Sequence, residues 1–317
     1  MKTKVFIDGS EGTTGLRIYE RISRRDDIEL LPIRTELRKD PEERRRLINA
    51  SDITFLCLPD AAAKEAVSLV ENEHVVIIDA STAHRTEEGW AYGFAELSKE
   101  HREAIKNGKR IAVPGCHATG FISLVYPMIA GGFLPADYPV SAFSLTGYSG
   151  GGKKMIAAYE AEDKAADLFA PREYALTQEH KHLKEMSRIT GLSRIPLFSP
   201  IVDDYYSGMV VTVPLYADML TNADVDGLRA FFAEYYRGQR LITVADAEDE
   251  IAASGFLSGN QRSGSDSLKI YITGNKDRIL LSSQFDNLGK GASGAAMQCM
   301  NIVLGCDETK GLSVISS

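Results

Sequence analysis

The segment Val113-Pro114-Gly115-Cys116-His117-Ala118-Thr119-Gly120 places a single cysteine between an apolar run and a helical pattern. The apolar run, 110–113, has the composition of a buried strand, and the helical pattern covers 119–129. A thiol at such a turn faces the first N–H groups of the helix, which lack partners within the helix and carry partial positive charge. This environment favours thiolate over thiol, so Cys116 is a candidate nucleophile.

Two of the six histidines lie close together, at His180 and His182. On an extended segment, residues two apart face the same side, so both imidazoles could serve one site and transfer a proton beside Cys116. The adjacent His117 is a competing imidazole, and a pair of ordinary surface histidines is the alternative interpretation. No third ligand lies nearby in the sequence, so we expect no metal site.

Two glycine-rich segments could bind anions. Gly9-Ser10-Glu11-Gly12-Thr13-Thr14-Gly15 follows a strand-length apolar run and opens a helical pattern, the context in which backbone N–H groups hold a pyrophosphate. Ser149-Gly150-Gly151-Gly152-Lys153-Lys154 could present N–H groups and ammonium charge to an anion. A plain tight turn and a flexible loop are the respective alternatives. In the first segment we expect the cofactor contacts to be Gly9, Ser10, Gly12, Thr13, Thr14 and Gly15.

The end of the second apolar run bears on which dinucleotide binds. Sites for NAD usually carry an acidic residue there, whereas this chain has Arg34-Thr35 and then Arg38, which suit a 2′-phosphate. We therefore expect NADP, with solvated loop residues as the alternative. At the ends of later runs we expect Pro59 and Ser81 to contact the cofactor, and Arg85 to bind a substrate carboxylate or phosphate. A surface ion pair of Arg85 with a neighbouring glutamate is the alternative.

The pattern of the first third predicts a doubly wound α/β domain with a parallel sheet. Its expected strands are 4–8, 28–33, 53–58, 75–80 and 110–113, and its expected helices are 14–24, 61–71 and 95–107. After Cys116, long alternating segments and a turn at 274–277 predict an α+β domain with a mainly antiparallel sheet. Its expected strand regions are 141–149, 196–216 and 268–287, and its expected helices are 154–169 and 223–236.

Composition narrows the class of protein. The chain has 317 residues, which predicts two domains, and a net charge of −8, which argues against nucleic-acid or anionic-membrane partners. Its four cysteines lack the density of a disulfide framework, and neither a secretory leader nor a run of about 18 apolar residues is visible. We therefore expect a cytoplasmic protein with a small-molecule ligand. Exposed apolar strand faces expected in the second domain favour a homodimer or homotetramer.

These motifs, in this order, resemble the N-acetyl-γ-glutamyl-phosphate reductases of arginine biosynthesis, in particular their short form. The resemblance spans nearly the whole chain and is most specific over 286–301, Asp-Asn-Leu-Gly-Lys-Gly-Ala followed by Ser-Gly-Ala-Ala-Met-Gln-Cys-Met-Asn. It implies a Rossmann domain and an α+β catalytic domain, as in aspartate-semialdehyde dehydrogenases. It also implies that the C-terminal helix returns to the first domain, giving expected domains of 1–116 with 292–317 and of 117–291.

The resemblance implies roles for individual residues. Cys116 is the acyl-accepting nucleophile and His180 the acid/base, while Asn287 lies near the nicotinamide. His182 and Glu185 shape the substrate site, to which we also assign Arg85, Ser149, Gly150 and Lys153.

Two positions depart from the commoner long form. Lys184 stands where that form has proline, and His117 stands where it has tyrosine. The implied reaction is NADPH-dependent reduction of an acyl phosphate to an aldehyde through a Cys116 thioester. A reductase of the same architecture acting on another acyl phosphate, such as aspartyl phosphate, and a non-catalytic dinucleotide sensor are the alternatives.

Overall fold

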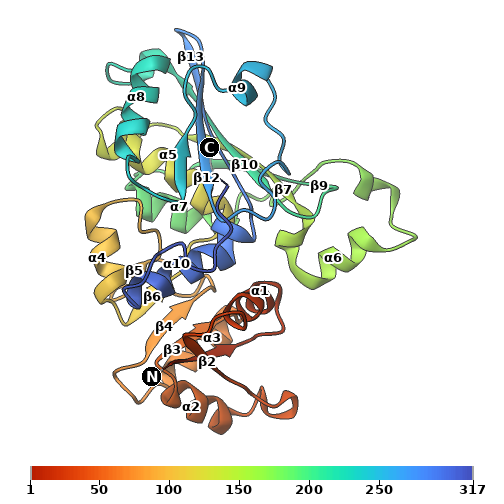
Figure 1. Cartoon of the computed structure of the whole chain (residues 1–317). Helices are drawn as coiled ribbons and strands as arrows, with labels where there is room; N and C mark the ends of the chain where they lie inside the picture. The colour runs from red at the N-terminus through yellow and green to blue at the C-terminus, as the bar shows by residue number, and fades with distance from the viewer. Residues whose placement is uncertain (1, 316–317) are drawn as a thin grey trace. The chain divides into compact units, whose positions relative to one another are not determined.

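A computed structural model of the protein describes residues 2–315, the side chain of Ile251 excepted. The chain divides into two compact units (Figure 1). Of the described residues, the first unit comprises 2–115 and Ala292–Leu312, and the second comprises Cys116–Gly291 with 313–315. Cys116 is thereby the first residue of the second unit. No helix within the described residues is long and apolar enough to cross a membrane.

The first unit is built on a six-stranded, entirely parallel sheet of order β2-β1-β3-β4-β6-β5. Its strands are β1 (Thr3–Asp8), β2 (Ile28–Leu31), β3 (Ile53–Leu56), β4 (Val76–Asp79), β5 (Ala91–Tyr92) and β6 (Arg110–Ala112). Its helices are α1 (Thr13–Ile22), η1 (Thr35–Leu37), α2 (Pro41–Ala50), α3 (Asp60–Ser68), α4 (Lys99–Asn107) and α10 (Gly294–Val303). The predicted doubly wound domain is confirmed, with the short edge strand β5 as an addition.

Both faces of this sheet are covered because its strands are apolar throughout. Alternate residues point to opposite faces, so Val5 and Ile7 of β1 join one core cluster and Phe6 joins the other. The first cluster contains side chains of α1, α4 and α10, and the second contains side chains of α2 and α3. Helices cover both faces because the chain adds strands on both sides of β1: β2 lies on one side, and β3 and β4 lie on the other. The strand order therefore reverses between β1 and β3. In open α/β sheets, ligands bind at the carboxyl ends of the strands beside such a reversal.

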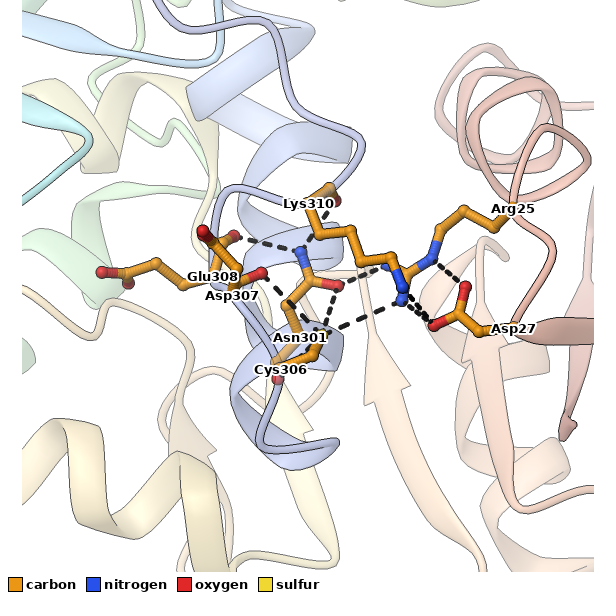
Figure 2. Close-up of polar contacts among 7 residues, drawn as sticks. All are labelled: Arg25, Asp27, Asn301, Cys306, Asp307, Glu308 and Lys310. Carbon is orange, nitrogen blue, oxygen red and sulfur yellow. Dashed lines mark hydrogen bonds and ion pairs between the residues drawn. The ribbon is translucent and has the colours of Figure 1, made fainter. Parts of the chain in front are cut away.

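The C-terminal helix α10 belongs to the first unit, where it packs against α4 and β4 (Figure 1). The last turns of α10 and the segment after it are joined by polar contacts to the turn before β2 (Figure 2). Arg25 donates to Asp27 at 2.9 and 2.7 Å and to Asn301 Oδ1 at 2.5 Å, and Lys310 Nζ lies 2.9 Å from Asp27. The hydrogen bond from Arg25 is the main cause of a lowered pKa of Asp27. Distant parts of the sequence are thus joined by charge as well as by apolar packing.

The second unit is built on a seven-stranded mixed sheet of order β11-β12-β13-β10-β7-β9-β8. Its strands are β7 (Ser141–Gly147), β8 (Arg172–Glu173), β9 (Leu197–Asp203), β10 (Met209–Tyr216), β11 (Ile242–Val244), β12 (Leu268–Gly274) and β13 (Arg278–Phe285). Its helices are α5 (Cys116–Ala130), η2 (Tyr148–Gly151), α6 (Gly152–Glu160), η3 (Ala166–Phe169), α7 (Leu183–Thr190), η4 (Ala217–Met219), α8 (Val225–Tyr235) and α9 (Glu250–Ser254). A π-helical turn, η5 (Gly289–Ser293), precedes α10.

Four of the six strand pairings in this sheet are antiparallel, so a mainly antiparallel sheet is confirmed. The pairings β7–β9 and β11–β12 are parallel. One face is buried, with α5 packed on β10 and β13 and α8 on β11 and β12. Strand alternation buries Val211 and Leu281 on this face and leaves Phe143 and Leu280 exposed on the other.

Three local predictions are wrong. The helix expected over 154–169 is broken into α6 and η3, because Lys164 bonds to Asp204 and lies over the Phe169 ring at 4.0 Å, which holds the chain on another path. The helix expected from 95 begins at Lys99, where the Ser98 hydroxyl caps it by accepting the His101 N–H. The helix expected from 119 begins at Cys116 itself.

Candidate functional site

Cys116 opens α5, directly after Pro114 and Gly115. As the first helical residue it lies among N–H groups that have no acceptor one turn earlier in the helix, which is the position from which a helix stabilises negative charge. The thiol is half-buried and forms no disulfide. Gly291 approaches it so closely that an added Cβ there would lie 2.9 Å from the Cys116 Cβ. The glycine near the end of the second unit therefore keeps room beside the Cys116 side chain.

His117 points into the unit and is 3% exposed. Its Nδ1 lies 2.7 Å from the Ser144 hydroxyl and its Nε2 lies 2.6 Å from the Tyr174 hydroxyl. Burial, with smaller contributions from His180 and Lys181, lowers the pKa of His117 to about 3. The imidazole therefore stays neutral near pH 7 with both nitrogens engaged, which leaves it poorly suited to general acid/base work.

His180 and His182 precede α7 in a turn, in which the Leu183 N–H bonds to the His180 carbonyl at 3.0 Å. The extended segment expected here is therefore wrong, yet the two rings lie together, with centroids 4.7 Å apart. His180 Nδ1 accepts the His182 backbone N–H at 3.1 Å. In its neutral form His180 consequently carries its proton on Nε2.

The imidazoles of this unit form one cluster. The His117 ring centroid lies 5.2 Å from that of His180 and 5.6 Å from that of His182. His182 is buried and His180 is half-buried, so His180 is the more accessible of the two. Glu185 is buried in the first turn of α7, beside the exposed Lys184. Among the described residues, no group of three or more His, Cys, Asp and Glu side chains is arranged to hold a metal ion.

Ser149 and Asn287 form a second polar pair of this unit, brought together from distant parts of the sequence. The Asn287 amide donates to the Ser149 hydroxyl at 3.0 Å and accepts the Gly208 N–H at 2.8 Å. Both side chains are buried, whereas Gly150 in η2 and Lys153 at the start of α6 are exposed. Asn287 thus fixes the base of the glycine loop and leaves its tip and its lysine open to a ligand.

In the first unit, the loop Gly9–Gly15 follows the carboxyl end of β1, beside β3, where the strand order of the sheet reverses. Gly9 has φ of +90°, and a Cβ there would lie 2.4 Å from the Cys57 carbonyl oxygen at the end of β3. A Cβ on Gly15 would lie 2.3 Å from the Gly9 carbonyl oxygen. At Gly12, the N-cap of α1, the nearest atom to an added Cβ lies at 3.5 Å. Gly9 and Gly15 are therefore required by the turn itself, whereas Gly12 leaves space above the helix N-terminus.

The other residues expected at the cofactor lie around this edge of the sheet. Ser10, Thr13 and Thr14 are partly exposed in the loop and first turn of α1. Arg34 and Thr35 are exposed, and Arg38 forms an ion pair with Glu11 of the glycine loop. Pro59 is the exposed N-cap of α3.

Two residues predicted to meet ligands are engaged within the first unit. The buried Arg85 donates to the Val113 carbonyl at 2.8 Å and to the Ala80 carbonyl at 3.2 Å, which ties together the ends of β6 and β4. The buried Ser81 donates its hydroxyl to Asp79 at 2.7 Å. The contacts of Arg85 therefore fix the backbone that leads into Cys116, and all the contacts described here are to backbone carbonyl groups.

Sequence reasoning missed Tyr174 and Ser144. Neither belongs to a recognisable motif, and they follow Cys116 by 58 and 28 positions. The alternation of β7 indicates that Ser144 points inward, but nothing local identifies its partner. The structure gathers Cys116, His117, Ser144, Ser149, Tyr174, His180, His182, Glu185 and Asn287 in the second unit and the glycine loop, Arg34, Arg38, Pro59, Ser81 and Arg85 in the first.

Comparison with known proteins agrees with this division. Residues 10–107 match the family described as "Semialdehyde dehydrogenase, NAD binding domain", and residues 116–287 match "Semialdehyde dehydrogenase, dimerisation domain". Among solved structures, aspartate semialdehyde dehydrogenase II of Vibrio cholerae superposes with a TM-score of 0.71 at 16% identity, over 96% of this chain and 99% of that one. The enzyme from Candida albicans gives a TM-score of 0.65 at 14% identity, over the same shares. These likenesses establish the fold.

The sequence relatives are much more similar. N-acetyl-gamma-glutamyl-phosphate reductase 2 of Nostoc sp. is 45% identical over 320 aligned residues, covering 98% of this chain and 99% of that protein. The N-acetyl-gamma-glutamyl-phosphate reductase of Burkholderia cenocepacia is 44% identical, covering 95% and 97%. The chain therefore belongs to the N-acetyl-gamma-glutamyl-phosphate reductase family.

Proposed function

We propose that the protein reduces N-acetyl-γ-glutamyl phosphate with NADPH to N-acetylglutamate 5-semialdehyde and phosphate. The observation that carries this proposal is the thiol at the first residue of α5 in the same unit as the His180 imidazole, within a chain of this family. A thiolate and a proton donor are the two groups that reduction of an acyl phosphate through a covalent intermediate needs.

In the first step the Cys116 thiolate attacks the acyl carbon and expels phosphate, which takes up one proton from solvent as it leaves. The C–O bond to phosphate breaks as the C–S bond forms, giving a thioester. N–H groups of the first turn of α5 stabilise the oxyanion of this step, an effect of about 3 kcal/mol for one such donor. Lys153 and the N–H groups near Gly150 supply positive charge for the phosphate.

NADPH, when bound, supplies the hydride that reduces the thioester carbonyl. His180 donates a hydrogen bond from its Nε2–H to the carbonyl oxygen as negative charge develops there, and this bond stabilises the oxyanion until it collapses to the aldehyde. The C–S bond then breaks, and Cys116 is released as the thiolate. His182 and Glu185 orient the substrate beside these groups.

The glycine loop fits a dinucleotide because Gly12 leaves the N-terminus of α1 open to a pyrophosphate. Ser10, Thr13 and Thr14 add hydroxyl groups at the same place, and Pro59 and Ser81 line the neighbouring strand ends. Arg34, Thr35 and Arg38 bind the 2′-phosphate of NADPH, with Arg38 held near the loop by Glu11.

An assay in the oxidative direction tests the substrate. The purified protein should reduce NADP⁺ in the presence of N-acetylglutamate 5-semialdehyde and phosphate, followed by absorbance, and aspartate semialdehyde serves as the matched control. Activity with aspartate semialdehyde alone would overturn the substrate assignment. Cys116→Ala should abolish turnover and still bind NADPH in a fluorescence titration, which separates loss of the nucleophile from loss of the cofactor site.

We also propose that the protein is a homo-oligomer joined through the uncovered face of the seven-stranded sheet. Large apolar side chains gather on that face: Leu197 is 66% exposed, Tyr216 60%, Phe143 49% and Leu280 41%. A patch of this kind favours association, and the matching family description includes the word dimerisation. Light scattering should give a multiple of 34.7 kDa, and Leu197→Lys should lower it.

We place the protein in the cytoplasm. All four cysteines are free thiols, which suits a reducing compartment. Cell fractionation with an antibody against the chain tests this assignment.

A further inference from the structure

The turn that leads to His180 contains two non-glycine residues in left-handed backbone conformations. Ala175 has φ of +53° and Gln178 has φ of +59°, and the Gln178 N–H bonds to the Ala175 carbonyl at 2.9 Å. Residues other than glycine keep this conformation only where surrounding contacts hold them in it, and such residues gather at functional sites. The proposed reaction gives neither residue a task. Contacts with another part of the unit must therefore hold this turn.

The side-chain amide of Gln178 supplies such a contact, because it binds the backbone of one residue of β9. Its Nε2 donates to the Phe198 carbonyl at 2.8 Å, and its Oε1 accepts the Phe198 N–H at 2.9 Å. A primary amide presents the same donor and acceptor as a peptide group, so one side chain satisfies both. The short strand β8 pairs with β9 as far as Ile201, and the Tyr174 N–H then bonds to the Pro200 carbonyl at 3.1 Å. The Gln178 amide takes the place of a further strand residue along this edge.

The ring of the residue that Gln178 binds lies against the imidazole cluster. Phe198 is 1% exposed, and its ring centroid lies 5.3 Å from that of His180 and 5.2 Å from that of His117, edge to face in both cases. His180 follows Gln178 by two positions, and its Nδ1 accepts the His182 N–H at 3.1 Å. Gln178, Phe198 and His180 thus form a closed ring of contacts: amide to backbone, aromatic ring to imidazole, and two residues of chain.

We propose that Gln178 is a positioning residue for the proposed reaction: its amide ties the turn before His180 to β9 and so sets where the His180 imidazole lies. The inference rests on the proposed role of His180. A donor that stabilises an oxyanion must lie about 3 Å from that oxygen, and a displacement of about 1 Å can cost about 100-fold in rate. A water molecule could satisfy the Phe198 backbone groups equally well, but it would not join the turn to the strand.

The test compares two substitutions at Gln178, which is an exposed residue, so that little buried packing is lost. Gln178→Met keeps an unbranched side chain of similar length and removes both hydrogen bonds. Gln178→Gly also removes them, and glycine adopts the left-handed conformation without strain. In the oxidative assay, both should lower kcat about tenfold or more and leave the KM for NADP⁺ unchanged. Thr177→Met, at the neighbouring exposed position, is the matched control and should keep the wild-type kcat.

Proton NMR of the full chain without substrate gives a second readout. The His180 ring protons lie close enough to Phe198 to be shifted by its ring current, so their resonances should move in both Gln178 variants. Those of the exposed His74 should stay in place in every variant. A general loss of stability would not produce this selective change.

A wild-type kcat in both Gln178 variants would overturn the proposal, and so would unshifted His180 resonances. A wild-type kcat in Gln178→Gly alone would also overturn it, because backbone conformation rather than the amide would then place His180. A loss in Thr177→Met equal to that in Gln178→Met would contradict a specific role of the amide. The NMR readout requires no turnover. A protein inactive on N-acetylglutamate 5-semialdehyde whose His180 resonances still depend on Gln178 would refute the substrate and leave the positioning contact intact.

Discussion

Replacing Gly15 with alanine and replacing Gly12 with alanine should separate the structural role of the glycine loop from its role in binding NADPH. A Cβ on Gly15 would lie 2.3 Å from the Gly9 carbonyl oxygen, whereas one on Gly12 would lie 3.5 Å from the same atom. Ordinary carbon contacts are about 3.5–4.0 Å, so only Gly15→Ala forces the backbone of the turn to move by about 1 Å.

The expected magnitudes follow from these distances. Overpacking of this kind costs about 1–3 kcal/mol, which lowers the thermal midpoint by about 2–4 °C for each kcal/mol in a unit of this size. Gly12 has φ of −70°, which alanine adopts without strain, so Gly12→Ala should change stability by less than about 1 kcal/mol. Its methyl group would, however, occupy the space over the helix N-terminus. We expect its Kd for NADPH to rise about tenfold or more, which corresponds to about 1.4 kcal/mol.

The assay combines thermal unfolding without cofactor and fluorescence titration with NADPH for both variants. Gly15→Ala should lower the midpoint and weaken binding together, while Gly12→Ala should weaken binding alone. A Gly12→Ala protein that binds NADPH like the wild type would show that the loop does not hold the pyrophosphate. A Gly15→Ala protein of unchanged stability would refute the steric argument.

Three further predictions concern buried polar groups. Burial lowers the pKa of His117 in the folded protein to about 3, so the free energy of unfolding should fall by about 1.4 kcal/mol for each pH unit below about 6.5. In His117→Gln, the fall in the free energy of unfolding between pH 6.5 and 5, measured with urea, should be smaller by about 2 kcal/mol. Parallel pH profiles of the two proteins would contradict this prediction. Arg44→Leu should lower the free energy of unfolding by about 3–5 kcal/mol, because it leaves the buried carboxylate of Asp8, 2.9 Å away, without its ion-pair partner. The double variant with Asp8→Asn should recover most of this loss, and additive losses would refute the coupling. Asn287→Ala should lower the free energy of unfolding, measured with urea, by about 1–3 kcal/mol. It should also raise the KM for phosphate, because Ser149 loses its hydrogen bond to Asn287. An unaltered KM would show that Asn287 does not support the phosphate site.

Most of the first unit was predictable because its strands are short apolar runs buried on both faces. The five predicted strands each end within two residues of the observed ones, and only the two-residue β5 was missed. In the second unit, the helix expected over 154–169 failed because the contacts of Lys164 with Asp204, 40 residues away, and with the Phe169 ring override local helical preference. The parallel pairing of β7 with β9 likewise depends on a long connection that no local pattern specifies.

The sequence alone determined the features that depend on neighbours along the chain. Two such features are the glycine loop between β1 and α1 and the cysteine at the start of α5. Both depend on backbone N–H groups that are adjacent in the sequence, so residue type and spacing identify them. Tertiary structure decided the burial and the hydrogen-bond partners of each imidazole. In the sequence, the resemblance assigns the acid to His180 and leaves His117 as a competing imidazole, and only the tertiary structure brings Ser144 and Tyr174 to the nitrogens of His117, in a buried site that keeps its ring neutral. Proton position depends on hydrogen-bond partners, and here those partners lie 27 and 57 residues away.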